Sequence, residues 1–120
     1  MTLLVIALGA ALGAPCRYLV DLAVQARHDS AFPWGTLAVN VVGSYLLGVL
    51  ATSGPHLNPL VTAALGVGFC GAFTTYSTFS YETLRLLESR ATTLAAANAV
   101  ISVLAGLGAA ALGWTTGRLL

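Results

Sequence analysis

Hydroxyl and aromatic side chains interrupt the longest apolar segment of this 120-residue chain at residues 71–80. The preceding residues, 60–73, are apolar apart from Thr62 and several glycines. Hydroxyl groups then follow at positions 74, 75, 77, 78 and 80, with the rings of Tyr76 and Phe79 between them. Hydroxyl groups donate hydrogen bonds and an aromatic ring has a positive edge, so these residue types suit an anion that has lost its water. Their place inside an apolar segment predicts a broken membrane helix whose irregular backbone is buried in protein or lines a polar pathway.

The elements that must position this stretch are membrane helices, because the chain is too apolar for a soluble fold. Hydrophobic residues make up 58% of the sequence and charged residues only 8%, whereas soluble domains have about 25% charged residues. We therefore expect an all-α integral membrane protein with one domain, residues 1–120. The net charge of +1 and the absence of lysine exclude a nucleic-acid partner.

Four spans are predicted, at about residues 2–23, 34–52, 60–87 and 94–117. The first has no basic region before its apolar run, so we expect it to be retained rather than cleaved as a signal peptide. The third, at roughly 28 residues, would measure about 42 Å as a continuous helix, which exceeds the roughly 30 Å hydrocarbon core. The excess predicts a break near Gly71, where Gly68, Gly71 and Ala72 supply conformational freedom. Thr74 or Thr75 would cap the helix that resumes.

Glycines spaced four residues apart predict close contacts between helices. Gly9 and Gly13 form one GxxxG pair, and Gly113 and Gly117 form another. Small residues at this spacing let two helix backbones approach closely. We interpret these pairs as faces that need partners, which favours the association of two subunits.

A few polar side chains within the spans have two interpretations each. Arg17 and Asp21 share a helix face, and Arg17 either reaches the interface from a helix end or lines an aqueous vestibule, where its charge would attract anions. Asn40 in the second span either bonds two helices together or donates to an ion on a permeation path. Asn98 and Ser102, one turn apart in the fourth span, have the same two interpretations.

No residue cluster typical of a metal or catalytic centre occurs in the sequence. Cys16 and Cys70 lie in apolar segments and are expected to be small packing residues rather than a disulfide. His28 and His56 fall in predicted loops, without the neighbours that a ligand site would need. The sequence also lacks a CxxC motif.

The arginines predict only a weak orientation in the membrane. Arg27, Arg85 and Arg90 lie in the two connections on one side, and Arg118 lies near the C-terminus on the other. Positive residues favour the cytoplasmic side, so this count leans slightly towards termini outside the cytoplasm. A bias this small permits insertion in both orientations.

Three motifs resemble those of the Fluc/CrcB family of fluoride channels. Residues 68–82 resemble its third-helix signature, residues 35–44 its second-helix motif, and residues 9–17 its first-helix pattern of glycines and arginine. The resemblance covers nearly the whole chain. It implies an antiparallel, dual-topology dimer with two fluoride pathways. It also implies a structural sodium ion at the dimer interface, held by the backbone carbonyls of Gly71 and Thr74.

The resemblance also implies which side chains line the fluoride path. The two pore phenylalanine positions of the family fall on Tyr76 and Phe79, the second-helix asparagine on Asn40, and the hydroxyl track on Ser77 and Thr78. Tyr76 departs from the family phenylalanine. This departure implies either altered conduction or a subunit that works with a homologous partner, as a heterodimer rather than a homodimer.

The function implied is export of fluoride ion across the cell inner membrane by a multi-pass, lipid-embedded channel that relieves fluoride toxicity. A small multidrug-type, proton-coupled exporter is the main alternative, and it would need a carboxylate in mid-span. Asp21 and Glu82 lie near segment ends instead. An intramembrane enzyme would need a nucleophile with a base, and both histidines fall in loops, so we expect no enzyme. The composition is also compatible with a structural subunit that packs into a larger membrane complex.

Overall fold

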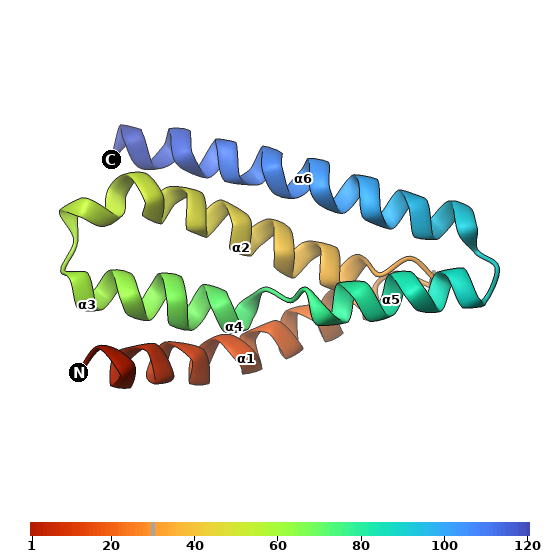
Figure 1. Ribbon diagram of the computed structural model, residues 1–120, viewed down its shortest axis with the longest axis horizontal. Helices are drawn as coiled ribbons and strands as arrows, with labels where there is room; N and C mark the ends of the chain where they lie inside the picture. The colour runs from red at the N-terminus through yellow and green to blue at the C-terminus, as the bar shows by residue number, and fades with distance from the viewer. Residues whose placement is uncertain (30) are drawn as a thin grey trace.

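The computed structural model describes residues 1–29 and 31–120, and most of them are helical (Figure 1). The three longest helices are α1 (Thr2–Ala26), α2 (Trp34–Ser53) and α6 (Thr92–Leu119). A further helical run lies between α2 and α6. Its parts are the turn η1 (Gly54–His56), α3 (Pro59–Thr62), the π-helix η2 (Ala63–Cys70), α4 (Gly71–Phe73) and α5 (Ser77–Glu88).

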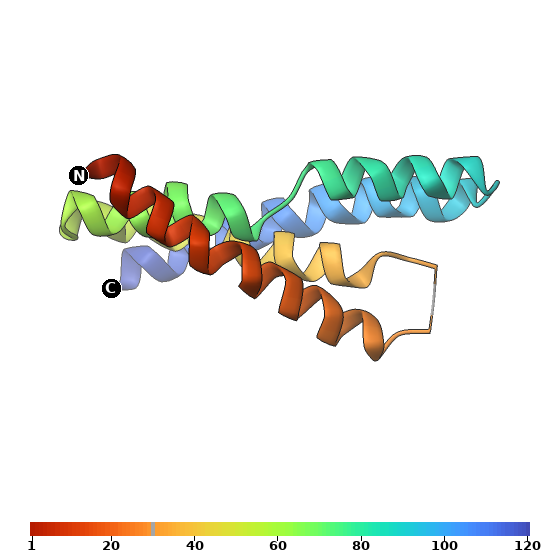
Figure 2. The same ribbon diagram turned by 90° about the horizontal axis from the view of Figure 1, so that it is seen from below.

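Four helical runs are long and apolar enough to cross a membrane, which confirms the predicted all-α class with four spans. They are Thr2–Ala26, Trp34–His56, Pro59–Glu88 and Thr92–Leu119. Each ends between one and four residues beyond its predicted limit. The protein is therefore a multi-pass membrane protein. Both termini lie at the same end of the molecule (Figures 1 and 2).

Helix limits at the connection between α2 and α3 follow from local chemistry. Gly54 and Pro55 end α2 in a single 3₁₀ turn. The Asn58 side chain then accepts a hydrogen bond of 2.8 Å from the Leu60 amide, and Pro59 occupies the first helical position of α3. An asparagine cap followed by proline is a favoured way to begin a helix, because both satisfy or remove amides that have no partner.

The first GxxxG pair packs inside the chain. A β-carbon on Gly9 would fall on the Ala64 carbonyl, and one on Gly13 would fall on the Phe69 carbonyl, both in η2. Only hydrogen at these positions lets α1 and η2 lie backbone to backbone. The α1 face that seemed to need a second subunit is therefore already covered by η2.

The second GxxxG pair does the same between α2 and α6. A β-carbon on Gly113 would meet the Tyr45 carbonyl, and one on Gly117 would meet the Thr52 hydroxyl. The predicted close helix contacts at both glycine pairs are confirmed, but the interpretation that they favour the association of two subunits is wrong, because helices of the same chain are the partners. The glycine pairs give no support to a dimer.

Between α4 and α5, residues 74–76 lie outside helix. Thr74 is extended, with φ −82° and ψ 160°. The prediction that Gly68, Gly71 and Ala72 supply the freedom for this change is wrong. Gly68 belongs to η2, where a β-carbon would meet the Ile6 carbonyl, and Gly71 is helical with φ −61°. An extended conformation is open to any residue, and β-branched threonine favours it, so no glycine is required.

The non-helical residues change which helix the chain packs on. Before them, η2 and α4 lie along α1; after them, α5 lies along the first half of α6. Figure 2 shows the accompanying sideways step, with α5 displaced from the line of α4. Residues 74, 75, 76, 78 and 79 line two cavities at this step, and these cavities form the candidate site.

Candidate functional site

The step between α4 and α5 is held in place by Asn40 of α2. The Asn40 side chain donates from Nδ2 to the Thr75 carbonyl at 2.9 Å and accepts from the Thr75 amide at Oδ1 at 2.8 Å. Because the Thr75 amide can only donate, this pair of bonds determines which end of the Asn40 amide faces it. Asn40 thereby replaces two backbone bonds that a continuous helix would have made.

Thr75 is further tied down by its side chain. Its hydroxyl accepts a hydrogen bond of 3.2 Å from the Thr78 amide, in the first turn of α5, and lies 3.5 Å from the Ser77 hydroxyl. Thr75 thus has the capping role predicted for Thr74 or Thr75. Thr74 instead turns back along the chain, where its amide and its hydroxyl each donate to the Cys70 carbonyl at 2.9 Å.

On one side of residues 74–76 lies a cavity of about 330 Å³, here named the ring cavity. It brings together Asn40, Tyr76 and Phe79, three of the predicted path residues. The Tyr76 and Phe79 rings are 6.1 Å apart and tilted by 40°. The full lining is Asn40, Ser44, Leu47, Thr74, Thr75, Tyr76, Phe79, Ser102, Val103 and Gly106.

On the other side lies a smaller cavity of about 180 Å³, here named the arginine cavity. Two further predicted residues, Arg17 and Thr78, meet here. Its full lining is Arg17, Tyr18, Asp21, Thr36, Val39, Thr75 and Thr78. Four of these side chains carry hydroxyl groups, and the Arg17 cation and the Asp21 carboxylate line the same cavity, so it offers hydrogen-bond donors together with charges of both signs.

The structure therefore divides the predicted path residues between two cavities that share Thr75. Ser77 and Gly71 line neither of them. Ser77 is exposed, and its contact with the site is through the Thr75 hydroxyl. Gly71 has no atom within 4 Å of the position where a β-carbon would stand, so its surroundings are open.

Two contributors were missed in the sequence, Thr36 and Glu82, whereas Thr75 was predicted only as a possible helix cap. Thr36 lines the arginine cavity, and its hydroxyl donates to Glu82 Oε1. Glu82 in turn lines a polar cavity of about 380 Å³ beside the first connection, together with Gln25, Ala31, Pro33, Arg85, Leu86 and Ser89. One signal was available, because Thr36 stands one helical turn before Asn40 on the same face of α2.

Asn98 joins α6 to α5 near this site, and Ser102 bonds to Asn98 within α6. Asn98, only 1% exposed, donates to the Thr83 hydroxyl at 2.8 Å and accepts from Ser102 at 3.3 Å. The Thr83 hydroxyl in turn donates to the Phe79 carbonyl at 2.8 Å. Of the two interpretations of Asn98, the structure favours interhelical bonding, whereas Ser102 also lines the ring cavity.

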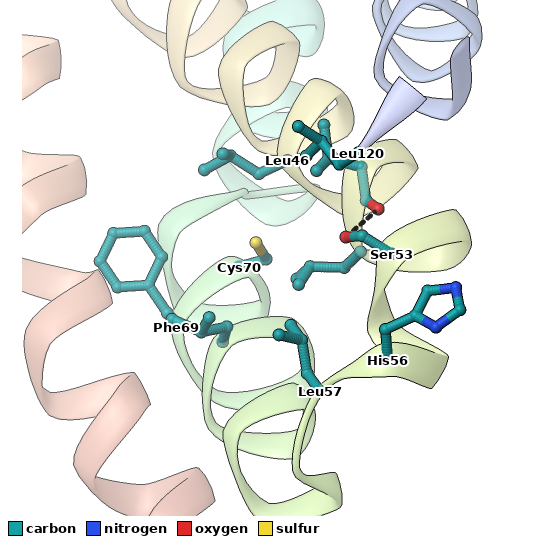
Figure 3. A pocket seen from close by; sticks show the side chains of 10 residues that line it. Leu46, Ser53, His56, Leu57, Phe69, Cys70 and Leu120 are labelled. Carbon is teal, nitrogen blue, oxygen red and sulfur yellow. Dashed lines mark hydrogen bonds between the residues drawn. The ribbon is translucent and has the colours of Figure 1, made fainter. Parts of the chain in front are cut away.

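A separate apolar cavity of about 590 Å³ lies between α2 and η2 (Figure 3). Only two of the described side chains that line it are polar. The Ser53 hydroxyl already donates to the Val49 carbonyl at 2.7 Å, and His56 is exposed at the edge of the cavity. Its lining is Leu46, Val49, Leu50, Ser53, His56, Leu57, Leu65, Phe69, Cys70 and Leu120. This cavity is apolar and lies outside the candidate ion site.

Side-chain metal ligands do not gather within residues 1–29 and 31–120, where no group of three or more His, Cys, Asp or Glu could hold a metal ion.

Comparison with known proteins identifies relatives over almost the full length. The chain is 60% identical over 113 residues to "Fluoride-specific ion channel FluC 1" of Streptomyces avermitilis, covering 92% of this chain and 90% of that protein. It is 58% identical over 123 residues to "Fluoride-specific ion channel FluC 1" of Frankia casuarinae, covering 97% and 95%. It is 47% identical over 122 residues to "Fluoride-specific ion channel FluC" of Magnetococcus marinus, covering 96% of each. The family model described as "CrcB-like protein, Camphor Resistance (CrcB)" matches residues 4–114, which confirms the resemblance noted in the sequence, and the chain belongs to this family.

Proposed function

We propose that this protein is a fluoride-specific ion channel and that the ring and arginine cavities belong to the fluoride path. One observation carries the proposal: hydroxyl, amide and ring groups from α1, α2 and α5 converge on both sides of the non-helical residues 74–76. The names of its close relatives as ion channels, rather than as enzymes or exporters, support the same function.

The chemistry of fluoride explains why these groups suit it. Fluoride is small and strongly hydrated, so a dry path must replace its water with donors. Asn40 donates one hydrogen of its side-chain amide to the Thr75 carbonyl, and the second hydrogen would be available to an ion in the ring cavity, which Asn40 lines. Phe79 can present its positive edge. Thr78 and Ser77 would add hydroxyl donors, and Arg17 would raise the local anion concentration as a vestibule residue.

We further propose that the channel is an antiparallel dimer inserted in both orientations, with the third span acting as a broken membrane helix. Irregular backbone at membrane depth is tolerated only where protein or water covers it. Tyr76 is 79% exposed in the isolated chain and Gly71 is open, so a second subunit would bury what this chain leaves bare. The small arginine bias, with three residues on one side and one on the other, also permits dual topology.

A structural sodium ion fits the backbone at this place. In a continuous helix the Gly71 carbonyl would accept from the Thr75 amide and the Thr74 carbonyl from the Thr78 amide. Here the first amide donates to Asn40 and the second to the Thr75 hydroxyl. The two carbonyls thus lose their usual donors, and carbonyl oxygens freed at a helix break suit a hard cation such as sodium. Bound there, sodium would supply positive charge and hold the break together.

The function is tested by fluoride efflux from liposomes that contain the purified protein. Phe79→Ile removes the ring edge but keeps apolar bulk, so flux should fall by at least about tenfold, which corresponds to about 1.4 kcal/mol of barrier. Leu112→Ile, on the lipid-exposed part of α6, is the matched control and should conduct like the parent. Folded Phe79→Ile protein that conducts at the parental rate would falsify the assignment of this path.

The same liposomes separate the channel from a proton-coupled exporter. A channel needs no proton gradient, so efflux should be unchanged when the internal and external pH are equal. Flux that stops without a pH gradient would favour the exporter. Export in cells, with the protein in the inner membrane, is tested by whether production of the chain lets a fluoride-sensitive bacterium grow in fluoride.

A further inference from the structure

We propose that Thr75 is a positioning residue for the sodium ion, and that it works by drawing the Thr78 amide away from the Thr74 carbonyl. This inference rests on the proposed sodium site. Thr75 is buried and makes several hydrogen bonds. The amide, the carbonyl and the hydroxyl of Thr75 all have protein partners, and the residue is 9% exposed.

The hydroxyl of Thr75 binds one of the first amides of α5. The first amides of a helix have no acceptor within it and must find one elsewhere. The Thr78 amide finds the Thr75 hydroxyl at 3.2 Å. In a continuous helix its acceptor would be the Thr74 carbonyl, four residues back. While the hydroxyl holds this amide, the Thr74 carbonyl stays free to bind a cation.

The backbone of Thr75 does the same for the second carbonyl, with Asn40 as its partner. The Thr75 amide donates to Asn40 Oδ1 at 2.8 Å, and by helical spacing its other acceptor is the Gly71 carbonyl. Thr75 therefore controls both competing donors: one is its own amide, and the other is bound by its own hydroxyl. Neither role requires Thr75 to touch the ion.

Removal of the hydroxyl tests this idea without removing any proposed ligand. Thr75→Val keeps the branched shape but offers no acceptor to the Thr78 amide. That amide then competes for the Thr74 carbonyl, and we expect sodium to bind about threefold to tenfold more weakly, the range produced by one net hydrogen bond. Thr75→Ser keeps the hydroxyl and should bind sodium like the parent.

The measurement is the midpoint of thermal unfolding of the purified protein as sodium replaces N-methylglucamine at constant ionic strength, without fluoride. Sodium that binds only the folded state raises this midpoint, and the concentration that gives half of the rise reports its affinity. Thr115→Val is the matched control, because its hydroxyl is exposed and bonds only to the Ala111 carbonyl in its own helix. Thr75→Ala removes the same hydroxyl with less bulk, in case valine prevents folding.

The outcomes are distinct. A weaker sodium response in Thr75→Val or Thr75→Ala, with a parental response in Thr75→Ser and Thr115→Val, supports the inference. A parental response in all four variants overturns it and leaves the sodium site standing. A parent whose unfolding midpoint does not change with sodium overturns both the sodium site and this inference. The channel function is then still tested separately, by fluoride efflux from liposomes with the parent and with Phe79→Ile. Failure of both hydroxyl-free variants to fold, even in high sodium, also contradicts it, because the hydroxyl would then be needed for folding itself.

Discussion

The two halves of the third helical run pack by different physical means. The first half, η2 and α4, lies against α1 through glycines that let two backbones touch. The second half, α5, is joined to its surroundings by side-chain hydrogen bonds to Thr36 and Asn98, and Asn40 holds Thr75 just before it. Backbone contact tolerates no added atom, whereas a hydrogen bond can be lost at a moderate cost. The rigid half anchors the site, and the hydrogen-bonded half supplies its chemistry.

The largest expected effect comes from adding bulk to the rigid half. Gly68→Leu would drive its side chain into the Ile6 carbonyl of α1, and neither backbone can withdraw. We expect destabilisation of about 3 kcal/mol or more and loss of folded protein in detergent. The measurement is the yield and melting temperature of protein that elutes as a single species.

Gly108→Ala is the control for that change. Gly108 has nothing within 4 Å of an added β-carbon, and alanine is the better helix former by up to about 1 kcal/mol, so this variant should be as stable as the parent or more stable. Equal losses in both variants would show that any change in helix glycine is harmful, and the distinction between the two halves would fail.

A smaller effect is expected where hydrogen bonds hold α5. Asn98→Leu removes the donor to Thr83 and the acceptor for Ser102, and leaves both hydroxyls without that partner. We expect a loss of about 1–2 kcal/mol, measured by chemical or thermal unfolding, with the protein still folded. Thr115→Val, on the exposed face of α6, should change stability by less than about 0.5 kcal/mol. A complete loss of folding in Asn98→Leu would mean that this hydrogen bond is as essential for stability as the glycine contacts.

The smallest effect is expected at Tyr76, where the ring is exposed and only its hydroxyl is changed. Tyr76→Phe introduces the phenylalanine that the resemblance to the family implies at this position. Stability should be unchanged, because the side chain is 79% exposed in the isolated chain. Fluoride flux should rise if the hydroxyl obstructs the path and fall if the hydroxyl is a donor to the ion, and efflux from liposomes decides between them. An unchanged flux would mean that Tyr76 stands outside the path despite lining the ring cavity, and chloride should stay excluded in every case.

Much of the site could be predicted from the motifs that resemble the Fluc/CrcB family. Asn40, Tyr76 and Phe79 were expected together, and the ring cavity unites them. The roles of the glycines could not be predicted, because a GxxxG pair states only that something approaches closely. Whether that neighbour is another helix of the same chain or a second subunit depends on how the helices fold back on each other.

Local composition by itself determined that the chain is helical, that it crosses a membrane four times, and where hydroxyl groups accumulate. These properties depend on neighbouring residues and on the apolar surroundings, so they can be read in order along the sequence. Only the tertiary structure decided that Thr36 meets Glu82, that Asn40 meets Thr75, and that residues 74–76 rather than the glycines leave the helix. The physical reason is that each of these depends on a hydrogen-bond partner or a steric neighbour more than 30 residues away, or on a threonine that adopts an extended conformation because such a partner is present.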